Sequence, residues 1–462
     1  MATATTERLR SYLEAFSEFN IRAEQQPAWL RALRERAFVR FCEAGFPTTK
    51  DEDWRFTNVN AIAQTPFALA RDAGQSAAAD AAALTPFRIP GAACRLVFIN
   101  GRFAPWLSDF GSLPRGAQVG SLADAIVDDN AALKNHLGRY VNLGRDAFCA
   151  LNTAFIEDGA YVYLPRRAVV EAPICLLFVS VPGDRPQMTH PRNLIVVEKE
   201  TEASVVEDYV SFGSGAFFSN AVTELVAGEN AVISHHLVER EDPQAFNAST
   251  LRMQQARSAN LSSHSVLLGG GLVRNNVHPV LAGEGGECLI NGLFVGSGSQ
   301  HMDNYMLVEH ASPHCSSRQF YNGILDDRSH GVFHGRIIVH KDAQKTDAKQ
   351  TNRNLLLSDD AQIDTKPQLE IYADDVKCTH GATIGQVEEN ALFYLRSRGI
   401  DEVSARRLLL LAFANECLDR MKCRPVRDYL HDVVRQWLPG ASSLISASAP
   451  AGEVERRWEE VG

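Results

Sequence analysis

The sequence predicts a mainly β protein, in which a central β-solenoid is flanked by helical segments. From about residue 160, short β-branched and aromatic runs such as YVYLP, ICLLFVSV and NLIVVEK are separated by Gly, Asn, Asp and Ser. No helix-length amphipathic segment interrupts these runs for more than 200 residues, which indicates an all-β body. We therefore divide the chain into a mostly helical N-terminal domain (residues 1–155), the solenoid (156–388) and a helical C-terminal domain (389–462).

A faint repeat favours the solenoid. Small residues recur after turns at separations of 28, 28, 29 and 27 positions, namely Ala203, Ala231, Ala259, Cys288 and Cys315. Most of these residues are followed by apolar or aromatic residues two and six positions later. A period near 28 with strand content fits one turn of a β-solenoid. The alternative is a β-sandwich, whose turn signals come every ~8 to 12 residues.

The N-terminal domain is predicted to contain helices joined by connectors. Residues 7–46 and 121–156 carry apolar residues at the three- and four-residue spacing of a helix. Between them, KDEDWRFTNV (50–59) is a polar and aromatic connector, and the alanine-rich segment 63–87 predicts a loop or linker. The stretch CRLVFINGRFAP predicts a β-hairpin, because the Asn-Gly pair at 100–101 favours a tight turn.

Three helices are predicted after the β body. The first covers residues 388–400 and ends at Gly399, and Asp401 caps the second. The third runs from about Pro425 to Leu438. One face of the second helix is more apolar than a lone surface helix needs, through Leu408, Leu411, Ala412 and Cys417. This face must pack on the solenoid or on another protein.

Composition excludes several classes of partner. No apolar run comes near the ~20 residues that a membrane span requires. The net charge of −10 argues against nucleic acid as the main partner. Nine scattered cysteines without a CxxC pair fit reduced thiols, and the amino terminus lacks the apolar centre of a signal peptide. We therefore expect a cytoplasmic protein.

The stretch KCTHGATIGQ carries the chemistry that stands out most. Cys378 and His380 lie two positions apart and share one face of a strand, so both could reach one metal ion or one partner surface. A packed cysteine beside a hydrogen-bonded histidine is the alternative for such a pair.

Other potential sites are weaker. The spacing of His310, His314, His330, His334 and His340 matches no standard zinc arrangement, and adjacent His235 and His236 point to opposite faces of a strand. The glycine-rich GGGLVRNN is not a phosphate-binding loop, and neither a GxSxG motif nor a paired-carboxylate signature is present. We therefore expect a protein that is not itself an enzyme.

The segment from RIIVHKDAQ to LRSRGI (residues 336–400) closely resembles the C-terminal signature of the SufB/SufD family of iron-sulfur cluster assembly proteins. HGATIGQ, with Gly381 and Gln386, resembles the SufD branch, as does PTTKDEDWRFTNV near the amino terminus. This resemblance implies a right-handed parallel β-helix between helical domains. It also implies pairing with SufB through the β-helix and docking of the ATPase SufC on the C-terminal helices.

The resemblance also assigns roles to residues. His380 matches a histidine at the SufB interface that is implicated in cluster formation, and Cys378 matches its neighbour. Imidazole and thiolate both ligate iron, so a transient iron or iron-sulfur cluster would be shared with SufB, with no cofactor held stably by the isolated chain. The candidate SufC contacts are Leu408, Leu409, Leu411 and Phe413.

Three alternatives remain open at this point. Alone, the chain could form a homodimer. It could instead be a SufB-type scaffold subunit, although Gly381 and the N-terminal pattern argue against this. A solenoid enzyme that acts on carbohydrate would predict a signal peptide and a carboxylate-lined cleft.

Overall fold

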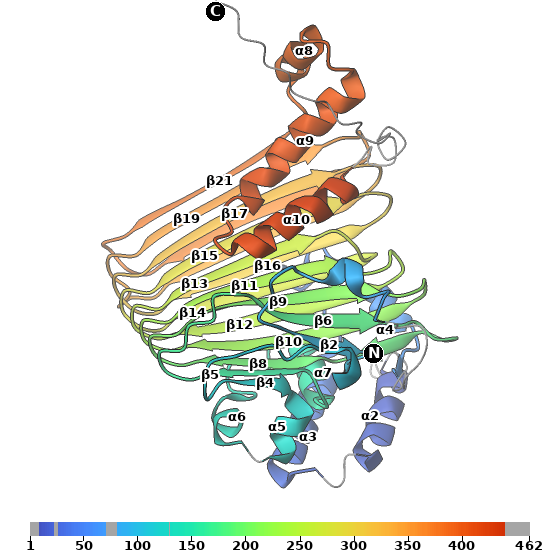
Figure 1. Ribbon diagram of the computed structural model, residues 1–462, viewed down its shortest axis with the longest axis vertical. Helices are drawn as coiled ribbons and strands as arrows, with labels where there is room; N and C mark the ends of the chain where they lie inside the picture. The colour runs from blue at the N-terminus through green and yellow to red at the C-terminus, as the bar shows by residue number, and fades with distance from the viewer. Residues whose placement is uncertain (1–8, 23–25, 71–80, 129, 439–462) are drawn as a thin grey trace, which may run out of the picture.

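Two stacked β-sheets form the centre of the computed structural model, which describes residues 9–22, 26–70, 81–128 and 130–438 (Figure 1). Sheet A has eleven strands and sheet B has ten. From β8 onward, consecutive strands alternate between the sheets and pair in parallel with their neighbours, so each turn of the chain adds one strand to each sheet. The β-solenoid is confirmed, and the β-sandwich alternative is wrong.

The strands of sheet A are β1 (Ala68–Leu69), β4 (Gln118–Ser121), β5 (Ala160–Leu164), β7 (Gln187–Thr189), β8 (Arg192–Val197), β10 (Phe217–Ala227), β12 (Phe246–Gln255), β14 (Leu272–Leu281), β16 (His301–His310), β18 (His330–Val339) and β20 (Gln362–Ile371). Those of sheet B are β2 (Cys94–Ile99), β3 (Arg102–Phe103), β6 (Ile174–Ser180), β9 (Glu202–Ser211), β11 (Val232–Arg240), β13 (Asn260–Leu267), β15 (Glu287–Gly296), β17 (Ser316–Leu325), β19 (Asp347–Leu356) and β21 (Lys377–Gly385).

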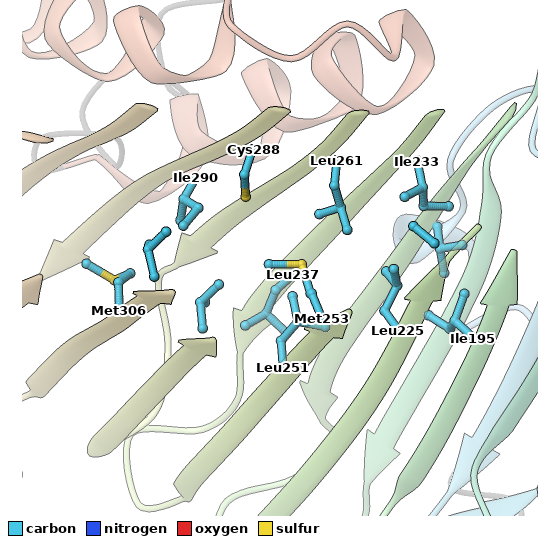
Figure 2. Close-up of a cluster of buried hydrophobic side chains, with 14 of the residues drawn as sticks. Ile195, Leu225, Ile233, Leu237, Leu251, Met253, Leu261, Cys288, Ile290 and Met306 are labelled. Carbon is cyan, nitrogen blue, oxygen red and sulfur yellow. The ribbon is translucent and has the colours of Figure 1, made fainter. Parts of the chain in front are cut away.

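The hydrophobic core lies between the two sheets. Alternate residues of each strand point inward, and residues in register on successive strands stack into rows (Figure 2). One row of sheet B consists of Ala203, Ile233, Leu261, Cys288, Ser317, Ala348 and Cys378. Figure 2 shows Ile233, Leu261 and Cys288 of this row side by side on neighbouring strands.

This row corrects the alignment of the repeat. Ala203 and Cys288 belong to it, but Ala231, Ala259 and Cys315 lie two residues before the corresponding positions. A slip of two residues leaves every side chain on the same face of a strand, so the pattern of burial could not reveal the error. The predicted repeat length was close to the observed one, but the residues aligned as equivalent between turns were wrong.

The corners of the solenoid explain why small residues recur. At one edge, a residue with positive φ stands in each turn: Arg167, Glu200, Asn230, Ser258, Gly285, His314 and Lys345. Its backbone N–H donates to a carbonyl of the next turn, as from Glu200 to Glu229 at 2.9 Å and from His314 to Gln344 at 2.9 Å. Ala231, Ala259 and Cys315 each follow such a residue directly and are buried at the corner.

The N-terminal region contributes helices and also strands. The helices are α2 (Arg10–Arg22), α3 (Ala28–Ala44), α4 (Asn60–Gln64), α5 (Leu122–Val127), α6 (Ala131–His136) and α7 (Ala147–Ala154), with 3₁₀ turns η1 (Glu52–Trp54), η2 (Thr85–Phe87) and η3 (Pro105–Leu107). The hairpin at Asn100-Gly101 is confirmed by the antiparallel pair β2–β3. However, β2 also pairs in parallel with β6, so it extends sheet B. The domain boundary at residue 155 stays a prediction. Residues 71–80, within the predicted linker, lie outside the described part.

The KDEDWRFTNV connector fastens the N-terminal region to the outer face of sheet A. The guanidinium of Arg274 on β14 lies 4.1 Å from the Trp54 ring centroid, and the ring of Phe148 stacks on Trp54 with its centroid 5.1 Å away. The Thr57 hydroxyl donates to Asp303 on β16, which also pairs with Arg274. The connector is therefore a packed part of the structure.

The C-terminal helices are α8 (Glu389–Ser397), α9 (Glu402–Leu418) and α10 (Arg424–Trp437). They confirm the three predicted helices: Asp401 accepts a hydrogen bond from the Ser404 N–H at 3.0 Å, and Gly399 has a φ of 85°. Apolar residues of α9 and α10 cover the outer face of sheet B, whereas α8 lies beyond the edge of the sheets (Figure 1). Residues 439–462 of the predicted C-terminal domain lie outside the described part.

Candidate site at the open end of the solenoid

The last turn of the solenoid, formed by β20 and β21, is not covered by a further strand of the described part of the chain, and we call it the open end. β20 pairs only with β18, and β21 pairs only with β19. No residue of either strand is buried, although five consecutive residues of β18 are. At the opposite end, Leu30 and Ile126 of the N-terminal helices pack on Tyr161 and Leu194. Long unpaired edges are templates for pairing with another chain, and solenoids need their ends capped. Both terminal strands therefore present unpaired backbone groups along one edge.

Cys378 and His380 both point into this open end. Cys378 lies in register with the buried Ala348 of β19, and His380 lies in register with the buried Gln350. Cys378 is half-buried against the interior core, while His380 is exposed. Since inward-facing residues alternate along a strand, the predicted common face is the inner face of the terminal turn.

The Cys378 thiol is not activated in this arrangement. Burial raises its pKa, and Asp347 adds to the rise, while the backbone N–H of Ala348 acts against it. A metal ion that binds the sulfur must therefore displace a proton. Among the described residues, no group of three or more His, Cys, Asp or Glu side chains is arranged to hold a metal ion.

Apolar residues surround the pair. Ile363 and Leu369 of β20 are half-buried against the interior core, on the sheet opposite His380. Ile384 of β21 is 51% exposed, and Ile371 at the end of β20 is 40% exposed. Sequence reasoning missed this apolar surround. The sequence does place Ile363, Leu369 and Ile371 on one face of a strand. It does not show that this strand is the last of its sheet.

The four candidate contacts on α9 differ in accessibility. Leu408 is 47% exposed, Leu409 and Leu411 are half-buried, and Phe413 is only 8% exposed. Phe413 packs on the chain's own sheet, where Asn322 donates to its carbonyl at 2.8 Å. Direct partner contact is therefore open to Leu408 and closed to the Phe413 ring.

A further apolar surface lies on α8 and was not predicted. Phe393 is 74% exposed and Tyr394 56% exposed, and α8 buries none of its residues. The adjacent aromatic residues are visible in the sequence, but their exposure follows from the position of α8 beyond the sheets.

The histidines whose spacing matches no standard zinc arrangement belong to no group of three or more potential metal ligands among the described residues. His310 is inside the solenoid and bonds Ser317 at 2.8 Å, while His314 occupies a corner. His235 bonds Glu207 inside, whereas the ring of His236 stacks on His264 outside, which confirms opposite faces.

Within the described residues, no helix has the length and apolarity to cross a membrane. A parallel solenoid with one end covered by helices and, at the other end, two terminal strands that each lack a neighbour on one edge defines the class: a β-solenoid protein with helical flanking regions.

Comparisons with known proteins identify the family. Residues 179–413 match the family model for the SufBD core domain of SUF-system FeS cluster assembly, and residues 6–176 match the model for the SufBD N-terminal region. The chain belongs to the SufBD family and is a subunit of the SUF iron-sulfur cluster assembly system.

Individual relatives agree. The chain is 35% identical to an iron-sulfur cluster assembly SufBD family protein of Synechocystis, over 84% of this chain and 86% of the relative. It is 32% identical to SufD of Escherichia coli, over 86% and 90% respectively, and 25% identical to SufD of Bacillus subtilis, over 92% and 97%. These relatives confirm the resemblance to SufD and leave no support for a carbohydrate-active enzyme.

Proposed function

We propose that this chain is a non-catalytic SufD-type scaffold subunit that joins a SufB subunit through the open end of its solenoid. The observation that carries this proposal is the uncapped last turn, where β20 and β21 each have one neighbour and no buried residue. In the absence of SufB, the same edges would pair with a second copy of this chain. The complex works in the cytoplasm, and this chain, with its net charge of −10, does not use nucleic acid as a partner.

At this interface, His380 admits or holds iron during cluster formation, and Cys378 takes part as a second ligand or as a structural neighbour. Support comes from the position of both side chains on the inner face of the strand, where Cys378 is half-buried and His380 is exposed. Two ligands are too few for a stable site, so SufB supplies the others, and the isolated chain holds no resident cofactor.

The ATPase SufC docks on the C-terminal helices. The exposed apolar residues there are Phe393 and Tyr394 on α8 and Val403 and Leu408 on α9. Large exposed apolar side chains on neighbouring helices favour a protein partner. Phe413 contributes indirectly, because it holds α9 on sheet B.

Co-expression with the cognate SufB and SufC tests this proposal. The complex is purified without oxygen, and iron and acid-labile sulfide are measured in the wild type, His380→Ala and His340→Ala. His340 is a control that is 48% exposed and pairs with Glu309 at 3.3 Å. We expect all three complexes to form and only His380→Ala to lose iron and sulfide. Equal loading in all three would reduce the pair to a structural role, and failure of the wild-type chain to join SufB would refute the proposed interface.

A further inference from the structure

On the strand next to His380, the residue in register with it is Gln350. The two residues are paired in register on β21 and β19, and Gln350 is in turn in register with Gln319 on β17. All three therefore belong to one inward-facing row that ends at the open end. Gln350 and Gln319 are only 1% and 2% exposed.

The Gln350 amide is bonded to the next amide of the row. Its Nε2 donates to Oε1 of Gln319 at 2.8 Å. Its own Oε1 is buried and accepts no hydrogen bond from any described residue. A buried amide oxygen without a donor is unfavourable by about 1–3 kcal/mol, so a missing partner is expected nearby.

The opposite sheet makes room for this amide. Gly335 on β18 faces Gln350, and a Cβ at Gly335 would stand 1.8 Å from Gln350 Nε2 and 3.1 Å from Gln319 Oε1. Gly335 has no positive φ that would require glycine for conformational reasons. Glycine is needed here because the amides of Gln350 and Gln319 occupy the space that a side chain at position 335 would take.

The same protein already contains an amide bonded to a histidine one strand away. Asn291 on β15 is in register with His264 on β13, and its Nδ2 lies 3.1 Å from His264 Nδ1. Neighbouring strands are ~4.8 Å apart, which one amide can bridge. No described residue forms a hydrogen bond with the His380 ring, so its nitrogens are available for a contact of the same span, with the amide oxygen rather than the amide nitrogen as the partner.

We propose that Oε1 of Gln350 accepts a hydrogen bond from one ring nitrogen of His380, which leaves the other nitrogen unprotonated and directed at the open end. Gln350 is thus a positioning residue for His380. Metal-ligating histidines commonly donate their second ring N–H to a fixed acceptor, which sets the tautomer and the direction of the lone pair. This inference rests on the proposed function only where iron is concerned, because the hydrogen bond itself needs no metal.

The direct test is the tautomer of His380 in the ¹⁵N-histidine-labelled chain, observed by long-range ¹H–¹⁵N NMR at a pH where the ring is neutral. The His380 signals are assigned by their absence in His380→Ala. We expect a single tautomer in the wild type and a mixture of both in Gln350→Met, which keeps the length of the side chain and removes the acceptor. A mixture in the wild type, or an unchanged single tautomer in Gln350→Met, would overturn the inference.

Further variants separate positioning from packing. Gln350→Glu should restore the single tautomer, because a buried, protonated carboxyl can donate to Gln319 and still offer its carbonyl oxygen. Gly335→Ala should mix the tautomers although residue 350 is still glutamine, since the added Cβ displaces the Gln350 amide. The matched control is Gln368→Met on β20, where the amide bonds Glu370 at 2.9 Å on the outer face; it should leave His380 unchanged. If Gln350→Met does not fold, Gly335→Ala and Gln350→Glu decide the question.

A second readout concerns iron. Anaerobic titration with Fe²⁺, followed through broadening of the His380 signals, should require about 10- to 100-fold more iron in Gln350→Met than in the wild type. The two proposals can fail separately. Loss of iron from the SufB–SufC complex in His380→Ala together with a wild-type tautomer in Gln350→Met would refute only the role of Gln350. Normal iron loading in His380→Ala would refute the proposed function even if the hydrogen bond exists.

Discussion

The guanidinium of Arg274 lies between the rings of Trp54 and Tyr305, 4.1 Å from the first centroid and 4.6 Å from the second. Trp54 comes from the N-terminal connector, and both other residues come from sheet A. Arg274 also pairs with Asp303 and donates to the carbonyl of Asp53 at 3.0 Å. This single arginine therefore ties the N-terminal region to the solenoid.

Trp54→Ala should lower the free energy of unfolding by ~2–4 kcal/mol, because it removes ring packing on Phe148 and the cation–π contact with Arg274. Urea denaturation measures the loss. The matched control is Trp106→Ala, since Trp106 is 49% exposed and should change stability by no more than ~0.5 kcal/mol. Equal effects of the two substitutions would show that the connector does not fasten the N-terminal region.

The corner residue His314 has a φ of 60°, where a side chain strains the backbone. His314→Gly should leave stability unchanged or raise it by up to ~1 kcal/mol, whereas His314→Val should lower it by ~1–3 kcal/mol. Thermal denaturation distinguishes the two directions. A valine that is as well tolerated as glycine would contradict the left-handed corner.

His310 should make stability depend on pH. Burial lowers its pKa from 6.5 to about 4, so the folded protein keeps it neutral. The unfolded chain takes up a proton below pH 6.5, and the contribution to stability, complete above that pH, is lost progressively as pH falls towards 4. Between pH 7.5 and 5.5, His310→Gln should therefore lose ~1.3 kcal/mol less stability than the wild type. Parallel pH profiles of the two proteins would contradict this assignment.

Substitutions on the C-terminal helices should show which residues contribute to SufC binding and which to the stability of the chain. Leu408→Ser and Phe393→Ser remove exposed apolar surface and should weaken SufC binding in a pull-down or calorimetric titration, with stability within ~0.5 kcal/mol of the wild type. Phe413→Ala should instead lower stability by ~3 kcal/mol, because its ring is buried against sheet B. Unchanged SufC affinity in both serine variants would place the docking surface elsewhere.

Much of the fold could be predicted from the sequence, because strand runs, turns and helix caps are local signals. The common face of Cys378 and His380 followed from strand geometry alone. The register of the repeat did not, since corners with positive φ use Arg, Glu, His and Lys as well as the expected Asn and Gly. Such residues give no turn signal.

The other misses depended on tertiary contacts. The exposed Leu408 and the buried Phe413 lie on one helix, and only its packing on sheet B distinguishes them. Gln350 was not singled out, because its importance comes from the neighbours that the solenoid stacks above, below and opposite it.

The most direct test of the central claim asks whether a histidine of this chain touches iron. The chain is labelled with ¹⁵N-histidine, assembled with unlabelled SufB and SufC, loaded with iron and sulfide, and studied by pulsed EPR in a paramagnetic state. We predict a ¹⁵N hyperfine coupling in the wild type and in His340→Ala that is lost in His380→Ala. Absence of the coupling in the wild type, or its persistence in His380→Ala, would contradict the assignment of His380 as an iron ligand at the open end.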